Sequence, residues 1–135
     1  MGIEELLREM MERGASDLHL SVPSPPILRI DGCLANLDGL PSLTPEDVEQ
    51  ALIRVTTNGQ QEIFEREREL DFAYNVPGLG RFRVNASLQR DTPKLSFRLI
   101  QAKAPSIEEL GLPEACKTLA MKEHGLVVVT GPTGS

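Results

Sequence analysis

The sequence of 135 residues has no tryptophan, only two cysteines and few aromatic residues, at 4% of the total. It also lacks any apolar run near the roughly 18 residues that a membrane-spanning helix requires. The N-terminal segment spreads acidic residues through an amphipathic pattern, unlike the basic start and apolar core of a signal peptide. We therefore expect a soluble protein that is not secreted.

The two cysteines, Cys33 and Cys116, form no Cys-x-x-Cys motif and no Cys/His cluster with metal-binding spacing. Isolated cysteines of this kind are typical of packed thiols in a reducing cytosol. The sequence therefore predicts two packed thiols and no metal site.

Positive charge is scarcer than negative charge. Fourteen Lys and Arg residues stand against twenty Asp and Glu residues, for a formal net charge of −6 and a pI near 4.9. A free-standing nucleic-acid-binding domain is usually basic, so we expect no nucleic-acid partner, although a local basic face is compatible with this balance. The hydrophobic share of 40% and the charged share of 25% are ordinary for a globular domain.

The first forty residues combine one helix pattern with strand patterns. Apolar residues at helical spacing predict a helix over 3–13 that ends at Gly14, where a helix often needs a residue tolerant of positive φ. The segments 16–21 and 26–31 predict short strands. Asp31-Gly32 is a strong signal for a tight hairpin turn into a third strand.

The next sixty residues change from helical to strand periodicity. Thr44 as N-cap and Pro45 at the first helical position predict the start of a helix. A second helix is predicted through 59–69, with a charged, solvated face. Apolar and polar residues then alternate over three segments: 70–76, 81–88 and 94–99. This alternation predicts an antiparallel sheet with one apolar and one polar face, and so an α+β fold packed by helices.

The last third of the sequence indicates a second unit. The patterns divide the chain into a first domain over 1–101, a linker over 102–112 and the start of another domain over 113–135. Within the linker, Ser106 and Glu109 match a helix capping box. A helix is predicted over 113–122, followed by a buried, β-branched strand over 126–130.

That strand leads into half of a phosphate-binding loop. The loop pattern is G-x-x-x-x-G-K-[ST]: its backbone N–H groups surround phosphate oxygens and its Lys neutralises their charge. The first five positions are matched by Gly131, Pro132, Thr133, Gly134 and Ser135. The alternative interpretation is a glycine turn without a ligand, but the preceding buried strand favours the phosphate loop.

The polar face of the predicted sheet carries arginines. Arg81 and Arg83 point the same way, and a hairpin would place Arg98 across from or diagonal to Arg83. One interpretation is a solvated strand face with ion pairs to the glutamates within 65–69. The other is a set of forked, permanently charged donors for a phosphate.

Two further polar residues lie in the first predicted strand. His19 has no neighbouring cysteine or second histidine, so we expect a structural role rather than metal binding. Asp17 has no carboxylate partner for acid–base chemistry, and we expect it at most to cap the entry to the strand.

Six segments, in this order and at this spacing, resemble the N-terminal part of the type IV pilus retraction ATPases (PilT-like), within the wider family of type II secretion and pilus assembly ATPases: GASDLHLS, ILRIDG, DFAYNVPGLGRFRVN, FRLI, IEELGLP and GLVVVTGPTGS. The resemblance covers essentially the whole chain. It implies a PAS-like N-terminal domain joined by a short linker to a RecA-like ATPase domain, with six chains in a ring and nucleotide between the two domains. A chain that begins directly with this domain resembles the retraction branch most.

The resemblance also implies a site and partners. ATP with Mg²⁺ would occupy the loop begun at Gly131, and the family's two phosphate-reaching arginines fall on Arg83 and Arg98. It implies a cytoplasmic protein at the inner membrane that meets the pilus platform protein there. Because the loop Lys lies beyond Ser135, we expect the 135-residue chain alone to be inactive and monomeric.

Three alternatives remain beside a retraction motor. The first is a PAS-like module that senses a ligand or binds a partner without enzymatic activity. The second is a purely structural assembly domain, for which loss of Arg83 and Arg98 would not change activity. The third keeps the ATPase but assigns it to type II secretion or pilus assembly.

Overall fold

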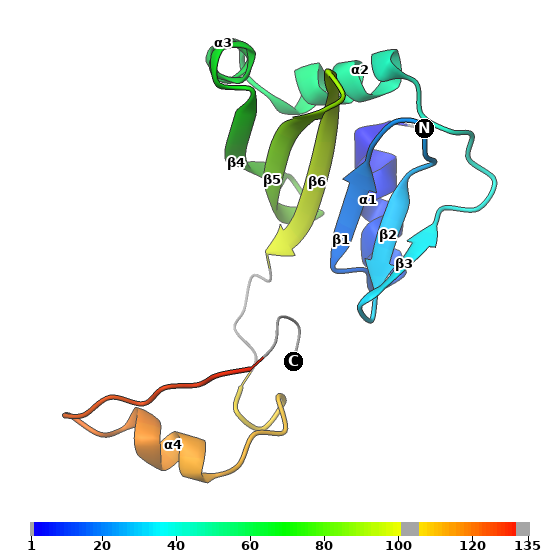
Figure 1. Cartoon of the computed structure of the whole chain (residues 1–135). Helices are drawn as coiled ribbons and strands as arrows, with labels where there is room; N and C mark the ends of the chain where they lie inside the picture. The colour runs from blue at the N-terminus through cyan, green and yellow to red at the C-terminus, as the bar shows by residue number, and fades with distance from the viewer. Residues whose placement is uncertain (1, 101–105, 132–135) are drawn as a thin grey trace. The chain divides into compact units, whose positions relative to one another are not determined.

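The computed structural model describes residues 2–100 and 106–131, and the chain separates into two compact units, Met1–Gln101 and Ala102–Ser135 (Figure 1). The first unit contains three helices: α1 (Ile3–Glu12), α2 (Pro45–Val55) and α3 (Asn58–Glu67). Among the described residues, no helix is long and apolar enough to cross a membrane.

Local side-chain chemistry sets the helix starts. The Thr44 hydroxyl accepts a hydrogen bond from the backbone N–H of Asp47, and the Asp47 carboxylate accepts one from the Thr44 N–H. Thr57 and Gln60 make the same reciprocal pair at α3. Each pair satisfies N–H groups that the first turn leaves free. The N-cap predicted at Thr44 is therefore confirmed.

The first unit also contains a six-stranded sheet in the order β3-β2-β1-β6-β5-β4, and every neighbouring pair is antiparallel. The strands are β1 (Asp17–Leu20), β2 (Ile27–Ile30), β3 (Cys33–Asn36), β4 (Glu69–Val76), β5 (Gly80–Gln89) and β6 (Thr92–Ile100). The turn between β2 and β3 has positive φ at Asp31 and Gly32, as the Asp-Gly signal predicts. The predicted α+β fold with an antiparallel sheet is thus confirmed.

One face of this sheet carries the hydrophobic core. Phe82, Leu95 and Phe97 are fully buried on β5 and β6, and Leu7 and Met10 of α1 are fully buried as well. Figure 1 shows α1 behind β1 and β2. The opposite face of these strands carries no helix of this unit. Arg83 and Arg98 on this polar face are exposed, whereas Asp17 is buried between its neighbours.

The second unit differs from its prediction. Ser106 and Glu109 form the predicted capping box, with hydrogen bonds of 2.7 and 3.1 Å. The helix predicted over 113–122 is shorter, as α4 (Ala115–Ala120). The buried strand predicted over 126–130 is wrong: Val129 is 92% exposed and no strand is formed there. β-Branched residues favour a strand only when another strand pairs with it, and none within 106–131 does.

The prediction of packed thiols is also wrong for one cysteine. Cys33 lies on β3, a short edge strand whose four residues are all exposed, whereas Cys116 is partly buried. An edge strand has a neighbour on one side only, so a small side chain there is not covered. Both thiols are free.

Candidate functional site

Arg83 and Arg98 lie directly opposite each other on the polar face of the sheet. Arg83 on β5 and Arg98 on β6 are partners in the antiparallel ladder, while Arg81 pairs with Ile100. Facing residues of an antiparallel pair have Cβ atoms about 5 Å apart. The two arginines that the sequence singled out are therefore neighbours, and Arg81 lies one step further along the same face.

A third strand holds the guanidinium of Arg98. Its Nε donates a hydrogen bond of 2.8 Å to Oδ1 of Asp17, its ladder partner on β1. The Arg98 side chain remains 69% exposed, while that of Asp17 is only 7% exposed. The guanidinium of Arg98 makes no other hydrogen bond within residues 2–100 and 106–131, so its two terminal nitrogens are left without a protein partner there.

Asp17 is the one buried charged residue among those that the structure describes. Besides Arg98, its carboxylate accepts a 2.8 Å hydrogen bond from the Ser16 hydroxyl and lies 3.5 Å from Nε of Arg29 on β2. Burial raises the pKa of Asp17, but the hydrogen bonds from Arg98 and Ser16 and the charge of Arg98 together lower that pKa below its ordinary value. The carboxylate is therefore ionised at neutral pH.

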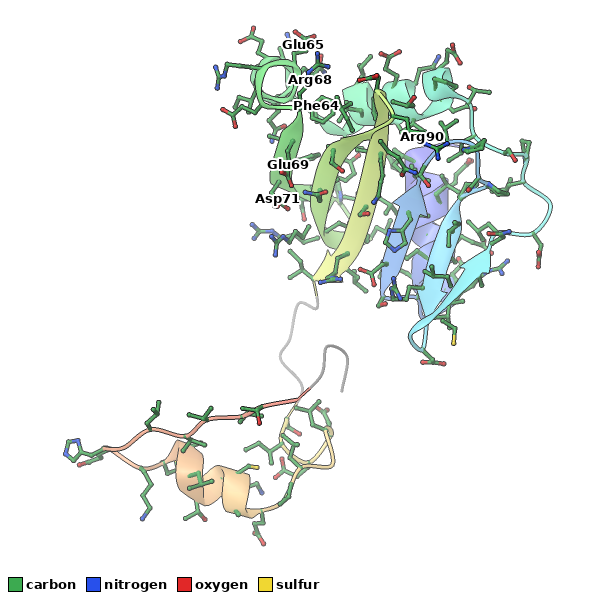
Figure 2. The ribbon with its side chains drawn as sticks, viewed as in Figure 1. Phe64, Glu65, Arg68, Glu69, Asp71 and Arg90 are labelled. Carbon is green, nitrogen blue, oxygen red and sulfur yellow. The ribbon has the colours of Figure 1, made fainter. Side chains whose placement is uncertain are left out.

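Arg83 is held in a looser way. Its Nε and Nη2 donate bonds of 3.2 and 3.4 Å to the carboxylate of Asp71 on β4. The two side chains are 66% and 48% exposed, and an exposed ion pair of this kind contributes little to stability. The ion-pair interpretation expected glutamates within 65–69 as partners, but the partner of Arg83 is Asp71. Figure 2 shows Asp71 and Glu69 along β4.

His19 lies on the same face, next to these charges. Its Nδ1 is 2.9 Å from the Ser96 hydroxyl, and its Nε2 is buried with no hydrogen-bond partner in the described part of the chain. Burial lowers the pKa of His19 from its ordinary value of 6.5; Arg29 lowers it further, while Asp17 opposes the change. A neutral imidazole is expected at pH 7.

The predicted phosphate loop lies almost entirely outside the described residues. Gly131 is the last residue that the structure describes, and Pro132, Thr133, Gly134 and Ser135 follow it. The sequence interpretation of these five residues therefore stays a prediction.

We call the polar side of the sheet that carries Arg29, Arg81, Arg83 and Arg98 the arginine face. Sequence reasoning missed Asp17 and Arg29 as members of it. The contact between Asp17 and Arg98 spans 81 positions and depends on β1 pairing with β6, which no local pattern encodes. The one available signal was that Asp17 and His19 alternate with the apolar Leu18 and Leu20. That alternation assigns Asp17 to a polar face but not to a partner.

The chain matches no protein-family model. It is 43% identical, over its full length, to the type IV pilus retraction ATPase PilT of Pseudomonas aeruginosa and 38% identical to the type IV pilus ATPase PilU of the same organism. These matches cover 39% and 35% of the two relatives, so the chain spans less than half of their length. A solved structure of the pilus retraction motor PilT with bound ADP matches the whole chain with a TM-score of 0.80 and 39% identity, again over 39% of that protein.

These similarities define the class. Over its full length the chain is similar to the N-terminal part of ATPases of the type II secretion and pilus family. The similarity is to PilT-like proteins, as the six sequence segments predicted, because a curated relative and a solved structure that match the chain over its full length are both PilT.

Proposed function

We propose that the chain is the N-terminal part of a motor ATPase that drives type IV pilus retraction, and that Arg83 and Arg98 act on the terminal phosphate of the nucleotide. One observation carries this proposal: the two arginines face each other on an open sheet face. The similarity of the whole chain to part of a pilus retraction ATPase supports the assignment to a pilus motor.

The chemistry of phosphoryl transfer calls for such residues. Negative charge spreads over the transferring oxygens, and positioned guanidiniums stabilise it. The loop begun at Gly131 would hold Mg-ATP, which would supply the phosphoryl group and a metal ion that offsets its charge. The exposed terminal nitrogens of Arg98 fit this ligand, because a guanidinium can donate to two phosphate oxygens at once.

The proposed architecture follows the resemblance. A PAS-like domain over 1–101 is joined through residues 102–112 to a RecA-like domain that starts at 113. In the complete protein six chains form a cytoplasmic ring at the inner membrane, next to the pilus platform protein, and nucleic acid plays no part. Closure of the first domain onto the nucleotide then converts hydrolysis into movement.

A PAS-like ligand sensor would need a cavity for its ligand. Two surface hollows of the first unit, of about 250 and 240 Å³, border α2 and lie away from Arg83 and Arg98, so these arginines would have no part in binding such a ligand. Twitching assays distinguish a retraction motor from an assembly or secretion ATPase. Loss of a retraction motor leaves pili that cannot retract, whereas loss of an assembly motor leaves no pili.

The test uses the complete protein. Arg83→Ala and Arg98→Ala should each lower kcat for ATP hydrolysis by about a thousandfold, while nucleotide binding changes much less. Arg66→Ala is the matched control, because Arg66 lies on α3 and, among the residues that the structure describes, its side chain binds only the adjacent Glu67. Wild-type rates in both single variants would exclude the proposed role of these arginines.

A further inference from the structure

Four charged residues form one row across the sheet. Arg29, Asp17, Arg98 and Arg83 are successive ladder partners on β2, β1, β6 and β5. Two of them, Arg98 and Arg83, are like charges directly opposite each other, which is an unfavourable arrangement unless anions lie beside them. Asp17 supplies one such anion from within the row.

The carboxylate of Asp17 is fixed in orientation. Oδ2 accepts from the Ser16 hydroxyl and faces Arg29, which leaves Oδ1 for Arg98. Since Asp17 is only 5% exposed, its carboxylate is largely shielded from water. A charge-assisted bond to a buried, immobile carboxylate is stronger and more directional than an exposed one.

The hydrogen bond to Asp17 is made at the Nε atom of Arg98, and this position determines which nitrogens stay available to a ligand. Nε lies at the inner end of the planar guanidinium, so one bond there sets the direction of the plane and leaves both terminal nitrogens unused. Arg83 differs, because it donates one terminal nitrogen as well as Nε to Asp71. Arg98 is therefore the better prepared of the two to hold a pair of phosphate oxygens.

We propose that Asp17 is a positioning residue that holds Arg98 by its Nε and aims its two terminal nitrogens at the phosphate. This inference rests on the proposed function of Arg98. Asp17 itself does not touch the nucleotide. Its loss leaves Arg98 charged but free to rotate, and a misplacement of about 1 Å at such a site costs up to roughly 100-fold in rate.

The first experiment measures orientation without any nucleotide. In ¹⁵N NMR spectra of the 135-residue chain, the Arg98 Nε–H should be shifted and protected from exchange with water, and its shift should follow the titration of the Asp17 carboxyl. Asp17→Asn should remove the protection. An Arg98 Nε–H that exchanges as fast as that of Arg66 in the wild-type chain would overturn the inference, and this result requires no variant to fold.

The second experiment is a double-mutant cycle in the complete protein. Asp17→Asn should lower kcat by roughly 10- to 100-fold, with KM for ATP changed much less, and should have little further effect when Arg98 is already Ala. Asp31→Asn, in the exposed turn after β2, is the control for replacing an aspartate by an asparagine. Ser16→Ala, which frees Oδ2 but keeps the charge, should give a smaller loss in the same direction.

The outcomes separate the two proposals. If Arg98→Ala keeps the wild-type rate, the proposed function of Arg98 fails. If Arg98→Ala is slow but Asp17→Asn and Ser16→Ala are both as fast as wild type, only the positioning role fails. If Asp17→Asn lowers kcat by the same factor in the wild-type protein and in the Arg98→Ala variant, Asp17 does not act through Arg98 and the inference is wrong.

Discussion

Arg83 and Arg98 are partners in the β5–β6 ladder, yet their guanidiniums bind carboxylates on opposite sides: Arg83 binds Asp71 of β4, and Arg98 binds Asp17 of β1. The first carboxylate is about half exposed and the second is buried. Two arginines with the same charge on the same face of the sheet are thus held by partners that differ in mobility. The buried partner makes Arg98 the more fixed of the pair.

The hydrophobic side of the sheet gives the first prediction. Leu7→Ala should lower the free energy of unfolding of the 135-residue chain by about 2–5 kcal/mol, because Leu7 is fully buried between α1 and the sheet. Ile53→Ala on α2 is the matched control: Ile53 is 56% exposed, and the loss should stay below about 1 kcal/mol. Urea denaturation measures both values, and equal losses would contradict the assigned core.

The pH dependence of stability gives the second prediction. The pKa of His19 is lower in the folded chain than its ordinary 6.5, so the unfolded chain binds a proton more readily. The stabilising contribution of neutral His19 should therefore be fully present above about pH 6.5. It should be lost as the pH decreases from there toward the pKa of His19 in the folded chain.

Thermal unfolding between pH 7.5 and 5 tests this dependence. The wild-type Tm should decrease over that interval, and the decrease should be smaller in His19→Phe, which cannot be protonated. The absolute Tm of the variant does not matter, only its slope against pH. An identical slope in both chains would show that another group causes the loss.

Much of the first unit could be predicted from the sequence because its signals are local. The Asp31-Gly32 turn, the Thr44 N-cap and the alternation over 81–88 each depend on residues close together in the chain. The antiparallel pairing of β5 and β6 follows from one short hairpin. The sequence alone therefore placed Arg98 across from or diagonal to Arg83, and the ladder shows that the two are directly opposite.

Features that depend on contacts between residues far apart in the chain could not be predicted from the sequence. The pairing of β1 with β6 joins Asp17 to Arg98 across most of the first unit, and hydrophobic alternation does not say which strands meet. The strand predicted over 126–130 failed for the same reason: its β-branched residues have the propensity but no pairing strand within the described residues. The exposure of Cys33 likewise follows from the edge position of β3.

The third prediction concerns the 135-residue chain alone. It should show no magnesium-dependent ATP hydrolysis, because its sequence stops at the fifth position of the phosphate-loop pattern and does not supply the loop Lys that contacts the β and γ phosphates. Phosphate release by the pure chain, compared with buffer alone, measures this. Turnover that requires magnesium and scales with the chain concentration would show that the loop is not needed.

The most direct measurement is kcat for ATP hydrolysis by the complete protein carrying Arg98→Lys. Lysine keeps the positive charge but has one compact ammonium group, so it can neither take the Nε bond to Asp17 nor hold two phosphate oxygens with a planar fork. We expect a rate close to that of Arg98→Ala, about a thousandfold below wild type, with nucleotide binding nearly unchanged. A wild-type rate in Arg98→Lys would contradict it, because charge alone would then be sufficient.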